Sequence, residues 1–517
     1  MKKLLIAITT LISFSAQAQK NSLLDQSFWQ GHPEASLVKA EVEKGNSPSQ
    51  LNSMSMDPVV IAINTQAPNA TIKYLLDQPG NSPAKLTHDG RTYLHWAANR
   101  GNAEVMDYLL TKGAKVDVVD SHGSTPLLFA AGSAQQNTKV YDLLLAHGDN
   151  LKTNVNQDGA NALLVAIAGD KDFALTNYFV SKGLDLNSVD ANGNNAFSYA
   201  ARSGNLEVIK AVLQKGVKPN PNAILMAAQS GGRRGGPNAG AGLPLYQYLE
   251  TLNVKPTALS KTGENVLHYV VRKPNQGEII NYFISKGVDV NKADDEGNTV
   301  LMNAAATNRD TAIIGLLLPR TKLINQTNQK GESALAMAVR SNSPEVVAYL
   351  ISKGADVKTA DKKGNNLAYY LMESYRAQNG MAAQGVGRPN GQGERPASAP
   401  RQDDFEAKLN LLKDKGLNVA APQKNGNTLY HLAIAKNDIS LLKRLEPLGI
   451  DINAKNTEGL TALHKAAMVA KDDNMMKYLL SIGAKKEATT NFKETAFDLA
   501  SENETLTKGN VSVNFLK

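Results

Sequence analysis

Few residues in this chain could carry out chemistry, and histidine is the first to consider. The chain has 517 residues, of which eight are histidine and none is cysteine. Four histidines close a Thr/Asn-x-x-His motif: His95, His268, His431 and His464. No two of them have the close spacing of metal ligands, so we expect no metal site. His32, His88 and His122 are isolated in the sequence, and we assign them to no site.

Searches for catalytic motifs also find no candidate. The sequence has no G-x-S-x-G serine elbow, no H-E-x-x-H pair and no phosphate-binding G-x-x-x-x-G-K-[ST] loop. The glycine pairs at 240/242 and 385/387 lack the third glycine of a dinucleotide site, because Leu245 and Asn390 stand in its place. We therefore predict that the protein is not an enzyme and takes no cofactor.

Basic side chains recur at one place in the sequence pattern, the two positions that follow the core of the first helix of a block. We call these six residues the basic ladder: Arg100, Arg202, Arg272, Lys273, Arg340 and Lys436. If they share one face, their charges would attract an acidic partner. They could equally be solvated helix-end residues that complement the helix dipole. The sequence leaves both interpretations open.

A block that returns twelve times positions these residues. It contains a glycine, a Thr, Ser or Asn, a helix of small residues, a second helix rich in leucine, and a Lys-Gly and Asp-Val-Asn tail. The aligned Thr-like positions are Thr92, Thr125, Asn161, Asn195, Asn222, Asn265, Thr299, Ser333, Asn366, Thr428, Thr461 and Thr495. Their spacing is 33 or 34 residues, except for single steps of 36, 27, 43 and 62. One block cannot bury its own apolar face, so the blocks must stack.

Each block carries its own start and stop signals. Thr125 followed by Pro126 begins a helix, because the hydroxyl accepts a free backbone N–H and proline lacks one. Leu463 and Ala466 recur at helical spacing, and small residues allow neighbouring helices to approach closely. Gly113 ends the second helix, where a positive φ satisfies the last carbonyls.

A period near 33 with this signature resembles the ankyrin repeat. The resemblance implies an all-α solenoid of helix-turn-helix units joined by short β-hairpin loops. Degenerate helix pairs at 23–42 and 57–76 bring the expected count to about 14 repeats. The resemblance also implies that the motif histidines tie neighbouring loops together by hydrogen bonds, and that the basic ladder lies on the concave face.

The repeats define the expected domain boundaries. Residues 19–88 form degenerate capping repeats, 89–376 and 405–517 form clear repeats with a C-terminal cap, and 231–242 and 377–404 are inserts. The inserts are rich in Gly, Pro and Arg and cannot bury enough apolar surface, so we predict flexible loops. Arg233 and Arg234 resemble arginine/glycine-rich nucleic-acid segments, but without aromatic residues a solvated linker is favoured. We expect no nucleic-acid partner.

The first 18 residues have the pattern of a secretion signal. Lys2 and Lys3 precede an apolar stretch, and Ala16-Gln17-Ala18 is a cleavage pattern. No later apolar run reaches the ~20 residues that cross a bilayer. We predict an exported protein, periplasmic in a Gram-negative host or alternatively secreted. Removal of both lysines lowers the formal charge from +8 to +6, which favours an acidic partner.

These observations predict an exported, non-enzymatic, monomeric scaffold. It would bind a partner protein with an acidic surface through its concave face and hairpin tips. One alternative is a periplasmic accessory protein that supports an envelope enzyme or its cofactor, for example in oxidative-stress defence. A second alternative is a secreted effector that acts on host proteins. A repeat fold by itself names no ligand.

Overall fold

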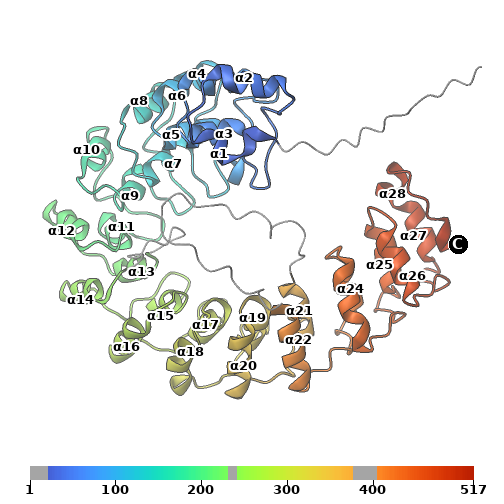
Figure 1. Ribbon diagram of the computed structural model, residues 1–517. Coiled ribbons are helices and arrows are strands. Elements are labelled where there is room, and N and C mark those ends of the chain that lie inside the picture. Colours follow the sequence, from blue (N-terminus) through green and yellow to red (C-terminus); the bar gives the residue numbers. More distant parts are fainter. Residues whose placement is uncertain (1–20, 231–240, 376–403) are drawn as a thin grey trace, which may run out of the picture. The chain divides into compact units, whose positions relative to one another are not determined.

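A computed structural model describes residues 21–230, 241–375 and 404–517 (Figure 1). The chain divides into two compact units, unit 1 ending at Val254 and unit 2 beginning at Lys255. The described residues contain 28 α-helices, which follow one another as fourteen pairs. None of these helices is long and apolar enough to span a membrane. The predicted all-α repeat architecture is confirmed within each unit.

Unit 1 contains seven of the helix pairs. Their bounds are α1 (Gln26–Trp29) and α2 (Ala35–Glu43), α3 (Pro58–Asn64) and α4 (Asn69–Leu76), α5 (Tyr93–Asn99) and α6 (Ala103–Thr111), α7 (Pro126–Gly132) and α8 (Lys139–Ala146), α9 (Ala162–Ala166) and α10 (Ala174–Ser181), α11 (Ala196–Arg202) and α12 (Leu206–Gln214), α13 (Ala223–Ala228) and α14 (Leu243–Thr251). First helices pack on first helices, as α5 does on α7, and second helices on second helices, as α6 does on α8.

Unit 2 contains the other seven pairs. Their bounds are α15 (Val266–Val270) and α16 (Gly277–Ser285), α17 (Val300–Thr307) and α18 (Thr311–Leu317), α19 (Ala334–Ser341) and α20 (Pro344–Ser352), α21 (Leu367–Ser374) and α22 (Asp404–Asp414), α23 (Leu429–Ile434) and α24 (Ile439–Leu445), α25 (Ala462–Val469) and α26 (Asn474–Ser481), α27 (Ala496–Glu502) and α28 (Glu504–Lys508). Here too α17 packs on α19 and α18 packs on α20.

The helices begin where their sequence signals predict. All twelve Thr-like positions are helix N-caps, so that part of the prediction is confirmed. Thr125 accepts the Leu128 N–H at 3.3 Å, and Pro126 follows at the first helical position. Side-chain caps of this kind satisfy backbone donors that would otherwise lack a partner.

Small and apolar side chains fill the space between stacked helices. Leu463, Ala466 and Ala467 on α25 are at most 1% exposed. The predicted stop signals also hold, because Gly113 and Gly354 follow second helices with φ values of 87° and 95°. A left-handed residue at this place closes the helix and turns the chain into the next loop.

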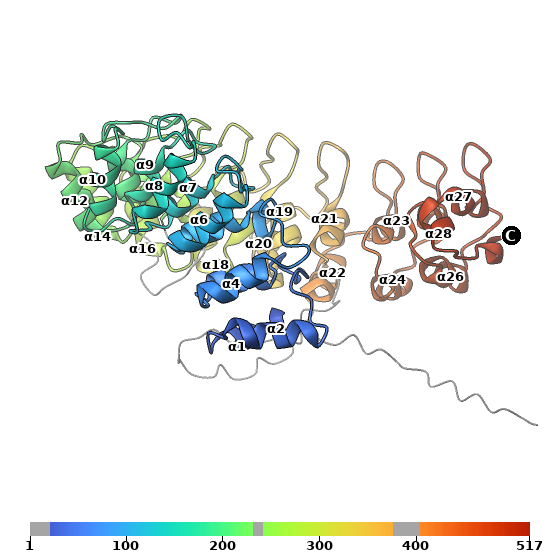
Figure 2. The same cartoon turned by 90° about the horizontal axis from the view of Figure 1, so that it is seen from above.

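Each pair of repeats is joined by a tight hairpin loop rather than by extended strands. Six of the described hairpins form an isolated antiparallel bridge, such as Val155 with Asn161 and Thr327 with Ser333. In unit 2 the loops before α19, α21 and α23 project from the same side of their helix pairs (Figure 2). The hairpin tips are therefore available as a surface distinct from the second helices.

Three sequence predictions concern residues outside the described part of the chain. The secretion signal at 1–18 lies outside it, as do almost all of the inserts predicted at 231–242 and 377–404. Both inserts fall between the first and second helix of a pair, one between α13 and α14 and the other between α21 and α22. At their edges, Ala241 is buried and Asp404 begins α22.

Candidate functional site

The basic ladder occupies equivalent places in its repeats. All six residues lie seven or eight positions after the N-cap of a first helix, at or just beyond the helix end. Arg100 and Arg202 belong to unit 1 at the ends of α5 and α11, whereas the other four belong to unit 2. The alignment of the repeats in the sequence therefore places the six residues at equivalent positions in the structure.

Two ladder arginines are held by glutamates of their own hairpins. Arg340 Nη1 lies 2.6 Å from a Glu332 carboxylate oxygen, and Arg272 Nη2 lies 3.5 Å from Glu264. The Arg340 guanidinium also lies over the ring of Tyr370 in the next repeat, 5.7 Å from its centroid. Both arginine side chains stay partly accessible, at 38% and 42% exposure. These pairs were not predicted from the sequence, although the constant Glu-to-Arg offset of eight residues could have revealed them.

Two other ladder residues reach back to the preceding repeat. Lys436 Nζ lies 3.6 Å from Glu373, and the Arg100 Nε donates to Asn64 Oδ1 at 3.0 Å. Arg202 is exposed at the end of α11. Lys273 is half-buried, and burial lowers its pKa to about 8. The ladder is thus a set of partly neutralised charges rather than a uniform basic stripe.

The motif histidines act inside the repeats. The His95 Nδ1 accepts the Thr92 backbone N–H at 3.2 Å, and its Nε2 lies 3.1 Å from the Ser124 carbonyl of the next repeat. His431 and His464 make the same two contacts, with Nε2 at 2.8 and 2.9 Å from carbonyls of the following hairpins. The predicted role in tying neighbouring loops is confirmed.

These contacts require neutral imidazoles. The backbone N–H donates to Nδ1, while the proton on Nε2 is donated to a carbonyl, and a second proton would abolish the first bond. Burial lowers the pKa of His95 to about 4. Burial also lowers the pKa of His268, His431 and His464 below the ordinary value.

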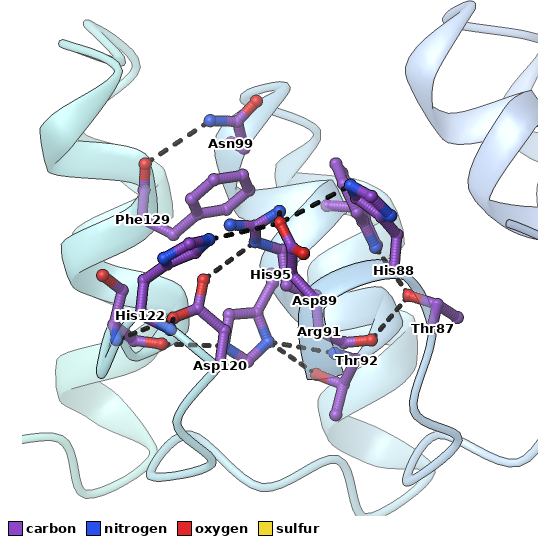
Figure 3. A network of polar contacts seen from close by, with 12 residues as sticks. Thr87, His88, Asp89, Arg91, Thr92, His95, Asn99, Asp120, His122 and Phe129 are labelled. Atoms are coloured by element: carbon purple, nitrogen blue, oxygen red, sulfur yellow. Dashed lines mark hydrogen bonds and ion pairs between the residues drawn. The ribbon is translucent and has the colours of Figure 1, made fainter. Parts of the chain in front are cut away.

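A polar cluster joins the hairpins before α5 and α7 (Figure 3). The Asp89 carboxylate oxygen Oδ2 lies 3.5 Å from His88 Nε2, 3.3 Å from His122 Nε2 and 3.1 Å from Arg91 Nη1. Arg91 also donates from Nε to Asp120 at 2.9 Å. Burial tends to raise the pKa of Asp89, but the charges of His88 and Arg91 and the hydrogen bond from His122 hold it below its usual value.

This cluster corrects the sequence analysis, which treated His88 and His122 as isolated. They are 34 positions apart, one repeat, and the Ser121 N–H donates to the Asp89 carbonyl at 2.8 Å, so the two tips are adjacent. Arg91 lies 4.2 Å above the ring of Phe129 and is 8% exposed. The cluster therefore clamps two repeats together. Within the described ranges, no group of three or more potential ligands is arranged to hold a metal ion.

Comparison with known proteins identifies the repeats. The family model for ankyrin repeats (3 copies) matches residues 30–120, 59–155, 133–223, 257–361, 399–490 and 430–510. Similar proteins include the E3 ubiquitin-protein ligase KEG of Arabidopsis thaliana, 25% identical over 54% of this chain and 18% of that protein. The phosphocholine transferase AnkX of Legionella pneumophila is 26% identical over 42% of this chain and 20% of its own length.

A third relative is the human transient receptor potential cation channel subfamily A member 1, which is 23% identical over 76% of this chain and 39% of the channel. The chain thus spans less than half the length of each of these relatives. What they have in common with it is the repeated helix pair. Because the family model matches more than half of the residues, the chain belongs to the ankyrin repeat family.

Proposed function

We propose that the protein is an exported, non-enzymatic scaffold that binds an acidic partner protein through its basic ladder and hairpin tips. Ankyrin repeats indicate a protein-interaction scaffold. The observation that carries the more specific proposal is the return of Arg or Lys to one place in separate repeats. A monomer presenting these charges would meet an acidic surface at several points in sequence.

The ion pairs between ladder arginines and hairpin glutamates favour the binding of an acidic partner. A guanidinium has five N–H donors, so the contact between Arg340 and Glu332 leaves donors for a second carboxylate. Because Glu332 already orders the arginine, binding a partner costs less side-chain entropy. The same holds for Arg272 beside Glu264. The glutamates therefore preorganise these arginines and leave part of each guanidinium able to bind a partner.

Two further observations support the proposals of export and of a non-enzymatic role. The charged, apolar and small-residue regions of 1–18 occur in the order of a secretion signal. The four motif histidines use both ring nitrogens in structural contacts, Nδ1 with the N-cap residue of their own helix and Nε2 with a carbonyl of the following hairpin. They are thereby occupied as structural groups.

The test combines charge reversal with crosslinking in the producing cell. A photo-crosslinking residue replaces Ser341, which follows Arg340 and is exposed. We expect an acidic protein to be captured, and Arg202→Glu, Arg272→Glu and Arg340→Glu together to reduce capture about tenfold or more. Capture should also decrease above ~0.15 M salt, where screening shortens to about 8 Å.

A matched control places the same charge change on the second helices, with Lys210→Glu, Lys286→Glu and Lys353→Glu. This variant should retain capture, since these lysines lie on α12 and at the ends of α16 and α20. Both variants should unfold nearly as the natural chain does, because exposed ion pairs contribute about 1 kcal/mol or less. Equal capture by the two variants would contradict the proposal.

A further inference from the structure

One apolar position recurs on the hairpins of unit 1. In five consecutive repeats, the residue six positions before the N-cap of the first helix is leucine or valine. We call these residues the apolar row: Leu51, Leu86, Val119, Val155 and Val189. Their exposed fractions run from 42% to 58%. Large exposed apolar side chains that repeat in one register mark an interaction surface.

The five hairpins share one backbone geometry. In the second repeat, the Asn52 N–H donates to the Met56 carbonyl at 2.9 Å, closing the hairpin. The corresponding bond in the fourth repeat joins Asp120 to Ser124, also at 2.9 Å. Asp120 directly follows Val119 and is buried, so alternation along the arm turns Val119 outward.

Contacts between the tips hold successive hairpins side by side. The His88 Nδ1 lies 2.9 Å from the Met54 carbonyl, which joins the second and third hairpins. The Ser121 N–H donates to Asp89 at 2.8 Å, joining the third and fourth. The fourth and fifth meet where Gln157 lies against Gly123, and Ala191 N–H donates to the Asp158 carbonyl between the fifth and sixth. The five hairpins that carry the apolar row are therefore adjacent to one another in order.

The hairpin itself does not require an apolar residue at this place. In unit 2 the equivalent residues are Leu259, Ala293, Thr327, Ala360, Pro422, Lys455 and Thr489. Thr327 bridges to Ser333 just as Val155 bridges to Asn161. Threonine and alanine thus support the same turn, and the valines of unit 1 serve another purpose.

The number of charged residues on the hairpins differs between unit 1 and unit 2, and this difference indicates which kind of partner the apolar row would bind. Side chains of an extended arm alternate between its two sides, so the residues four, six and eight positions before the N-cap share one side of each hairpin. In the five repeats of the apolar row, Asp117 is the one formally charged residue among these fifteen places. In unit 2, seven of the equivalent 21 places are charged: Lys261, Asp295, Lys358, Lys362, Lys424, Lys455 and Glu487. The face around the apolar row matches an uncharged segment.

Spacing identifies the conformation of that segment. Stacked helices lie about 8–10 Å apart, so the apolar row presents one side chain per repeat at about that interval. A polyproline II segment rises ~3.1 Å per residue with three residues per turn, which places every third side chain on one side about 9.3 Å apart. A β-strand repeats a face at about 6.7 Å and would lose register.

We propose that the apolar row of unit 1 binds an uncharged, proline-rich segment of a partner in the polyproline II conformation, with an apolar side chain at every third residue. About 13 such residues span the five positions. This surface lies on the hairpins, which the proposed function also uses, but it differs from the basic ladder in position and in chemistry, and its test does not rely on the acidic partner.

The test measures peptide binding to the full chain by fluorescence anisotropy. The probe is fluorescein-labelled (Pro-Pro-Leu)5, and the comparison peptides are (Pro-Pro-Ser)5 and (Leu-Ser)7, which has the period of a β-strand. We expect saturable binding of the first peptide alone. Leu86→Thr, Val119→Thr, Val155→Thr and Val189→Thr together should weaken it at least tenfold. Threonine keeps the hairpin intact, as Thr327 and Thr489 show.

Two controls keep the outcome specific. Leu259→Thr changes the equivalent residue of unit 2, which is 47% exposed, and should leave binding unchanged. Charge reversal at Arg202, Arg272 and Arg340 should also leave it unchanged, which separates this proposal from the acidic-partner function. No saturable binding of (Pro-Pro-Leu)5, equal binding by the four-threonine variant, tighter binding of (Leu-Ser)7, or self-association that the threonine variant abolishes would each overturn the proposal.

Discussion

The hairpins of unit 1 and unit 2 share a backbone and differ in what they present. Val155 in unit 1 and Thr327 in unit 2 stand at the same register and form the same bridge to an N-cap. At the outward places that flank this register, the five unit 1 hairpins carry one charged residue, Asp117, whereas the unit 2 hairpins carry lysines and acids. The N-cap, the buried turn residue and the helix core maintain the repeat, so the outward positions are free to diverge. One scaffold can thereby carry two surfaces.

The largest effect should be the same in both units, because it concerns the core that they share. Leu94 and Leu463 stand two residues after an N-cap and are 0% and 1% exposed. Leu94→Asp or Leu463→Asp would bury an unpaired charge and should cost about 4 kcal/mol or more of unfolding free energy. Urea unfolding of each variant measures this. A tolerated aspartate in either unit would show that the assigned register is wrong there.

Two hairpin glycines sharpen the comparison. Gly331 in unit 2 and Gly193 in unit 1 both have a positive φ, 84° and 78°. A Cβ on Gly331 would lie 2.5 Å from the Lys362 backbone nitrogen, whereas one on Gly193 would meet nothing within 4 Å. Gly193→Ala should cost about 1–2 kcal/mol from left-handed strain, and Gly331→Ala about 1–2 kcal/mol more. Equal costs in thermal unfolding would refute the close contact between the Gly331 hairpin and the backbone at Lys362.

A smaller difference is expected in how much stability each unit loses at low pH. Unit 1 has one motif histidine, His95, and unit 2 has His268, His431 and His464. Because burial lowers their pKa values on folding, the stability they contribute is complete above about pH 6.5 and decreases as pH falls below it, for His95 down to about pH 4. Each histidine costs at most about 1.4 kcal/mol per pH unit between its ordinary pKa and its lowered pKa.

Hydrogen exchange at pH 7 and at pH 5.5, compared at equal intrinsic exchange rates, reports the opening free energy of each unit. Unit 2 should lose more stability than unit 1. Replacing His464 with Gln should reduce the loss in unit 2 and leave unit 1 unchanged. A larger loss in unit 1 would mean that the histidine contacts do not govern acid sensitivity.

Local chemistry explains what could be predicted from the sequence. Thr125-Pro126 and the other N-cap signals act within one turn of helix, so each helix start was predictable from adjacent residues. The histidine ties followed from the family resemblance. The pairs Arg272 with Glu264 and Arg340 with Glu332 span a hairpin and a helix, and no single local signal specifies them.

Contacts between repeats were the least predictable. His88 and His122 converge on Asp89 because adjacent tips stack, although one repeat separates them in sequence. The apolar row was equally hidden, since a lone valine in a loop carries no signal until its offset from the N-cap is compared across repeats. In a repeat protein, the constant offset is the information that reveals a surface.

The most direct test of the account moves the apolar row from unit 1 to unit 2. In a chain with threonine at 86, 119, 155 and 189, the changes Ala293→Val, Thr327→Val and Ala360→Val extend Leu259 into four consecutive apolar positions. The same chain replaces the charged residues at the flanking outward places with serine: Lys261→Ser, Asp295→Ser, Lys358→Ser and Lys362→Ser. We predict that this chain regains binding of (Pro-Pro-Leu)5 to within about tenfold of the natural protein. A chain that unfolds normally and still fails to bind the peptide would contradict the claim that outward hairpin side chains, rather than the backbone, choose the partner.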